Sequence, residues 1–172
     1  MMLKIIYTLD TICLFGAILA SLSCLSLAIM LIVEVITTSF LSYSQPWAVE
    51  YSGYFLAAIL FVGSGWTLGQ GGHIRVNILL QFLAVRSLRL ADLMMTLFAL
   101  GLMVYVTFAV VENASRSLEL GSVSYYPTRT PLWVPQAVLA FGWILLCLGL
   151  ITRILRLIVG LPADKSDESL IE

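Results

Sequence analysis

The chain has 172 residues, of which 60% are hydrophobic and only 11% are charged, and its formal net charge is −1. Soluble domains carry about 25% charged residues, so this composition indicates a protein that is solvated mostly by lipid. The balanced charge and the lack of a basic tract exclude nucleic acid as a partner.

Four long uncharged stretches predict four transmembrane helices. A hydrocarbon core of about 30 Å needs about 20 helical residues, and each stretch is long enough. A charge near the middle of such a helix would cost about 2.5–3.5 kcal/mol, which explains the gaps in the charge pattern. The predicted helices are residues 11–33, 51–68, 92–111 and 133–152.

The first predicted helix could be mistaken for a signal peptide, because Lys4 precedes its apolar stretch. The apolar stretch is longer than the 7–15 residues of a signal-peptide core, and no A-x-A cleavage site follows it. We therefore expect the helix to be retained. The whole chain, 1–172, then forms a single all-α membrane domain, with 160–172 as a polar cytoplasmic tail.

The distribution of basic residues predicts how the chain is oriented. Lys and Arg gather on the cytoplasmic side of membrane proteins. On one side lie Lys4, Arg75, Arg86, Arg89, Arg153, Arg156 and Lys165, and on the other only Arg116 and Arg129. We expect both termini and the second loop in the cytoplasm, and the loops 35–49 and 112–130 on the outside.

Both predicted outer loops are rich in aromatic residues. Trp and Tyr commonly form a belt at the membrane–water interface, and they also favour contacts between proteins. Composition does not separate these two interpretations. The candidate contacts for an outer partner are Tyr43, Trp47, Tyr125, Tyr126 and Arg129.

The predicted spans contain no ionisable residue away from their ends. Ion and solute pathways normally need polar groups near the bilayer midplane, so we expect this chain alone to be neither a pump nor a carrier. An enzyme is equally disfavoured, because the chain has one histidine, and Cys13, Cys24 and Cys147 lack the spacing of a redox pair. We expect no catalytic residue, metal site or cofactor in this chain.

Small residues recur at helical spacing in several predicted spans, a pattern that lets helix backbones approach closely in lipid. We expect these stripes to pack within this chain or against another. They comprise Ala17, Ser21, Cys24 and Ala28 in the first span, Gly53 and Ala57 in the second, and Gly142 and Gly149 in the fourth.

The second loop, 69–89, contains the only histidine, His73, after a glycine-rich turn. The uncharged run 76–85 is too short to span a membrane. Arg75, Arg86 and Arg89 would share one helix face, which predicts an interfacial helix over 74–89 that contacts lipid headgroups or a partner and can continue into the third span. For His73 we expect a structural role, and the alternatives are a metal ligand, a proton relay or a pH sensor.

Two longer motifs resemble one known family. The stretch WAVEYSGYFLAAILFVGSGWTLGQGGHIRVNILLQFL is similar to the central signature of the small, Q-type, four-helix membrane subunit of tripartite ATP-independent periplasmic (TRAP) transporters, and TPLWVPQAVLAFGWILL is similar to that family's fourth helix. Asn77 stands where the family often has Asp, and Gln70 where it often has a basic residue. The matching positions are Trp47, Glu50, Gly72, His73, Ile74, Val76, Pro131, Trp133, Pro135 and Gly142.

The resemblance implies a function as well as a topology. Such a subunit is a scaffold in the bacterial inner membrane, paired with a large multi-span subunit that holds the substrate and sodium sites. A periplasmic binding protein delivers the solute, expected to be an organic acid or a related small molecule. The alternative is a self-contained four-helix membrane protein, such as a homo-oligomeric channel or an assembly factor.

Overall fold

The computed structural model describes residues 2–72 and 85–162, and for 85–89 it describes the backbone alone. The described residues are all-helical, and four of their helices are long and apolar enough to cross a membrane, which confirms the predicted fold class. The only pairing of β type among them is one isolated antiparallel bridge between Val123 and Pro131. The helices are α1 (Met2–Leu41), α2 (Ala48–Val62), α3 (Ser64–Gly69), α4 (Val85–Glu119) and α5 (Trp133–Val159).

All four spans are longer than the helices predicted from the uncharged stretches. The 40 residues of α1 are about 60 Å long, twice the thickness of the hydrocarbon core. Charge gaps mark only the part of a helix that lies in hydrocarbon, whereas backbone hydrogen bonding continues on both sides of it. Residues 85–89 of the predicted interfacial helix are the first turn of α4, and 74–84 lie outside the described residues.

The second span is interrupted. Helix α2 ends at Val62, and α3 continues the span after Gly63. The hydroxyl groups next to the break satisfy backbone carbonyls: Ser64 donates to the carbonyl of Phe61 at 2.7 Å, and Thr67 to that of Gly63 at 3.0 Å.

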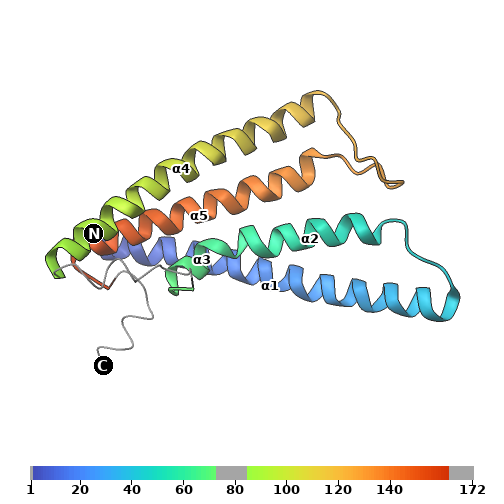
Figure 1. Ribbon diagram of the computed structural model, residues 1–172, viewed down its shortest axis with the longest axis horizontal. Helices are drawn as coiled ribbons and strands as arrows, with labels where there is room; N and C mark the ends of the chain where they lie inside the picture. Colours follow the sequence, from blue (N-terminus) through green and yellow to red (C-terminus); the bar gives the residue numbers. More distant parts are fainter. Residues whose placement is uncertain (1, 73–84, 163–172) are drawn as a thin grey trace.

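Helix α5 lies at the centre of the bundle, between α4 on one side and α1, α2 and α3 on the other (Figure 1). The α1–α2 and α4–α5 connections lie at one end of the bundle, here called the loop end. The beginning of α1, the beginning of α4 and the end of α5 meet at the opposite end, here called the charged end. Helix α4 packs mainly along α5.

Glycines make the closest contacts in the core. A methyl group on Gly142 would lie 2.7 Å from the carbonyl carbon of Phe61, and one on Gly149 would lie 2.9 Å from the carbonyl oxygen of Gly65. The small-residue stripe predicted in the fourth span therefore packs within the chain. The stripe predicted in the first span does not, because Ser21, Cys24 and Ala28 are exposed, and α1 instead buries Cys13, Gly16 and Ala20.

Candidate functional site

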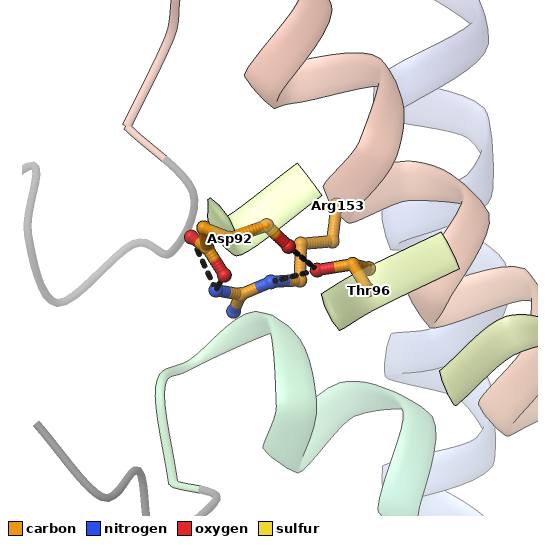
Figure 2. A network of polar contacts seen from close by, with 3 residues as sticks. All are labelled: Asp92, Thr96 and Arg153. Atoms are coloured by element: carbon orange, nitrogen blue, oxygen red, sulfur yellow. Dashed lines mark hydrogen bonds and ion pairs between the residues drawn. The ribbon is translucent and has the colours of Figure 1, made fainter. Parts of the chain in front are cut away.

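Two ion pairs close the charged end of the bundle. Arg153 on α5 is 6% exposed and binds both carboxylate oxygens of Asp92 on α4, at 2.8 and 2.9 Å. Its Nε also donates to the hydroxyl of Thr96 at 3.3 Å, and that hydroxyl in turn donates to the carbonyl of Asp92 at 2.7 Å, as Figure 2 shows. The network fixes α4 against α5.

The second ion pair lies one turn further along α5. Arg156, also buried, donates to a carboxylate oxygen of Asp10 on α1 at 2.7 Å. The two arginines, three residues apart on one face of α5, thus tie α5 to both α4 and α1. Removing one partner of a buried pair costs about 3–5 kcal/mol, since the other charge loses its compensation, so the two pairs stabilise this end of the bundle.

This network was not predicted from the sequence, in which Arg153 and Arg156 served only as orientation signals in the C-terminal tail. They belong to α5 itself, which ends at Val159. A signal was present: two arginines three residues apart follow the fourth uncharged stretch, and Asp10 and Asp92 border the first and third stretches on the same predicted side. Opposite charges at one depth of a membrane bundle pair with one another.

At the loop end, a buried carboxylate anchors the α4–α5 connection. Glu50, in the first turn of α2, is 4% exposed and accepts hydrogen bonds from the hydroxyl of Tyr54 at 2.7 Å and from that of Thr128. Thr128 belongs to the connection between α4 and α5. Glu50, one of the residues of the central motif, therefore fastens that connection to α2.

The anchored connection is a compact hairpin, residues 120–132. The amide of Ser124 donates to the carbonyl of Thr130 at 2.9 Å, and the amide of Leu132 to that of Ser122 at 3.0 Å. A tight turn closes it, in which the amide of Arg129, at φ +46°, donates to the carbonyl of Tyr126 at 2.9 Å. Pro127 follows Tyr126, at the position that proline favours in such turns.

A second carboxylate anchors the other connection at this end. Glu34 on α1 accepts a hydrogen bond from the hydroxyl of Ser44 at 2.7 Å and another from the amide of Gln45 at 3.0 Å. The chain reverses there through Ser42, at φ +51°. Each of the two loops at the loop end is thus held by one acid on a neighbouring helix, so both present a defined surface.

The predicted contact residues divide between these two loops. Tyr125 and Tyr126 are exposed on the hairpin, as is Arg129 at its turn. Tyr43 is exposed on the α1–α2 loop. Trp47 is half-buried at the start of α2, where its ring meets that of Tyr51 edge to face at 6.3 Å.

The other motif residues serve the fold. Pro131 pairs with Val123 in the hairpin, and Trp133 and Pro135 lie in the first turn of α5, where proline is tolerated. Gly142 lets α5 approach Phe61, and the amide of Gly72 donates to the carbonyl of Thr67 at 2.9 Å.

Part of the central motif lies outside the described residues, namely His73, Ile74, Arg75 and Val76. Arg86 and Arg89 lie on the first turns of α4, where only the backbone is described. Their predicted roles stay predictions. Among the described residues, no group of three or more His, Cys, Asp or Glu side chains could hold a metal ion.

Comparison with known protein families matches residues 27–160, from the second half of α1 to the end of α5, to tripartite ATP-independent periplasmic transporters, DctQ component. Searches of curated proteins and of solved structures returned no match. The family is one of transporter components and not of enzymes, and its members are inner-membrane proteins that belong to assemblies with a large subunit and a periplasmic binding protein. Since the match spans most of the chain, from within α1 through the other three membrane-spanning helices, this protein belongs to the DctQ family, the small membrane component of TRAP transporters.

Proposed function

We propose that this chain is the scaffold of a sodium-driven importer for an organic acid or a related small solute. It supports the large subunit, which holds the substrate and sodium sites, and it helps to dock the periplasmic binding protein. The observation that carries the scaffold role is the distribution of charge. Among the described residues, every acidic and basic side chain lies at or outside the two ends of the membrane-spanning bundle. The described part of the bundle at membrane depth therefore contains only side chains that pack, and none that would carry a charged solute.

The packing of the bundle supports the same role. The glycine contacts among α3, α5 and α1 and the two buried ion pairs leave little freedom for one helix to move against another. A part of a transporter that alternates between two conformations needs a packing interface that is stable in both of them. A rigid bundle instead suits the part of a transporter against which a moving part works.

The experiment that tests the scaffold role is reconstitution in liposomes with and without the large subunit. We expect uptake of labelled organic acids, driven by an inward sodium gradient, only when the large subunit and the binding protein are both present. Proteoliposomes with this chain alone are expected to match empty liposomes. Gradient-driven uptake or ion conductance by the chain alone would overturn the proposal and favour a self-contained channel.

The hairpin supports the docking role. It presents Tyr125, Tyr126 and Arg129 to solvent, and Glu50 holds it against α2, so a partner that binds it need not order it first. We expect the double substitution of Tyr125 and Arg129 by alanine to weaken binding of the periplasmic protein to nanodisc-held complex by at least tenfold. Lys4→Ala, at the charged end, is the matched control. Equal affinity of both variants would refute a docking role for the hairpin.

A further inference from the structure

Helix α4 exposes several aromatic side chains along its membrane-spanning part. Its exposed side chains include Met94, Phe98, Tyr105 and Phe108 at helical spacing, of which the last three are 77%, 74% and 72% exposed, beside aliphatic residues such as Leu97 and Leu102. The opposite face, with Thr96 and Thr107, lies against α5, where the hydroxyl of Thr107 is 3.5 Å from the sulfur of Cys147. The aromatic face is therefore turned away from the bundle.

The exposed face of α1 provides a comparison within the same molecule. Beyond Phe15, its exposed side chains at helical spacing are aliphatic, namely Ile18, Leu22, Leu25 and Ile29. Aliphatic side chains suit contact with lipid tails, whereas Met and aromatic residues are enriched where proteins meet. The larger share of aromatic residues and methionine favours α4 over α1 as the face that contacts a partner.

The hydroxyl of Tyr105 provides a second and independent observation. Asp92 and Glu112 bound the uncharged part of α4, and the residues between them span about 30 Å. Tyr105 lies about 10 Å from Glu112 along the helix axis, toward the middle of the span. Side chains of a helix lean toward its N-terminus, which places the hydroxyl of Tyr105 still further from Glu112. A tyrosine that anchors at the interface would instead place its hydroxyl at the headgroups.

Nothing within the described chain satisfies that hydroxyl. Tyr105 makes no hydrogen bond to another described residue, and the side chain is exposed. Leaving a hydroxyl unpaired in hydrocarbon costs about 4–8 kcal/mol relative to water, and lipid tails have no acceptor to offer. The group that covers this face therefore has to supply one, as a protein helix does through a side chain or a freed carbonyl.

We infer that the α4 face formed by Met94, Phe98, Tyr105 and Phe108 is the surface that binds the large membrane subunit, with an acceptor of that subunit opposite Tyr105. The inference rests on the proposed scaffold function, which requires such a partner. The buried Asp92–Arg153 pair and Thr96 support the face from behind, since they fix α4 on α5 at one end. α1 faces lipid.

Photocrosslinking in the intact complex tests the inference. p-Benzoylphenylalanine replaces Phe98 or Phe108 on α4, or Ile18 or Leu25 on α1 as matched positions of similar depth, with the large subunit co-expressed in membranes. We expect adducts with the large subunit, identified by mass spectrometry, from the α4 positions and not from the α1 positions. Adducts from α1 alone, adducts with a second copy of this chain, or lipid adducts alone from α4 would overturn the inference.

The hydroxyl is tested by Tyr105→Phe, which keeps the ring. We expect the large subunit to be bound about two- to tenfold more weakly, as for the loss of one net hydrogen bond, while the thermal stability of the isolated chain is unchanged. Tyr7→Phe on α1, an equally exposed tyrosine outside the charge-free span, is the control. Equal binding by both variants would refute the role of the hydroxyl. Failure of wild-type chain to co-purify with the large subunit would instead contradict the proposed function itself.

Discussion

Replacing Gly65 by alanine is expected to force α3 away from α5. The added methyl carbon would lie 2.5 Å from the carbonyl oxygen of Leu145 and 2.9 Å from its carbonyl carbon, whereas ordinary contacts begin at 3.4 Å. Both obstructing atoms belong to the backbone, so no side-chain rotation relieves the clash. The two helices have to separate by about 0.9 Å, and the contact of Gly149 with Gly65 opens with them.

The expected magnitude follows from two opposing terms. Overpacking of a tight interior costs about 1–3 kcal/mol. Alanine returns about 1 kcal/mol through its better helix propensity. We therefore expect the free energy of unfolding to fall by up to about 2 kcal/mol. The control is Gly101→Ala on α4, where an added methyl group meets nothing within 4 Å and only the propensity gain remains.

The assay is unfolding of each variant in mixed micelles by titration with a denaturing detergent, followed by the helical circular dichroism signal. We expect Gly65→Ala to unfold at a lower detergent fraction than wild type, and Gly101→Ala at an equal or higher one. If Gly65→Ala were as stable as Gly101→Ala, the close approach of α3 and α5 would not be a determinant of this fold.

The remaining predictions concern the polar anchors and the histidine. Asp92→Ala is expected to destabilise the bundle by about 3–5 kcal/mol in the same assay, whereas replacing Asp92 and Arg153 together by leucine and methionine is expected to restore most of the loss; no recovery in the double variant would contradict a paired charge. Glu50→Ala is expected to speed hydrogen exchange of the hairpin amides and leave those of α5 unchanged, with Glu34→Ala as the control that affects the other loop; unaltered exchange in the hairpin would remove the anchoring role. His73→Ala is expected to leave uptake by the complete transporter within a few fold but to lower the yield of complex; complete loss of uptake with the complex intact would refute a structural role.

The spacing of charges determined the number of membrane-spanning helices and their approximate positions. A membrane excludes charge from its interior, so the uncharged stretches are visible in the one-dimensional sequence. The same reasoning placed Glu50 at the end of a span, and the motif around it, together with the fourth-helix motif and the four-helix topology, predicted the family that the comparison confirms. The lengths of α1 and α4 were not predictable in this way, because a helix is free to continue beyond the hydrocarbon.

Contacts between distant residues were decided only by the tertiary structure. The stripe of small residues in α1 was as regular in sequence as the glycines of α5, yet the α1 stripe faces outward. The sequence could not predict this difference, because helical periodicity shows which residues share a face and not which face is buried. Nor did the sequence distinguish a tail arginine from one that binds Asp92 or Asp10. Charge pairing depends on distance in space, and the packing of the helices sets that distance. Only the tertiary structure therefore shows that these ion pairs hold the charged end together.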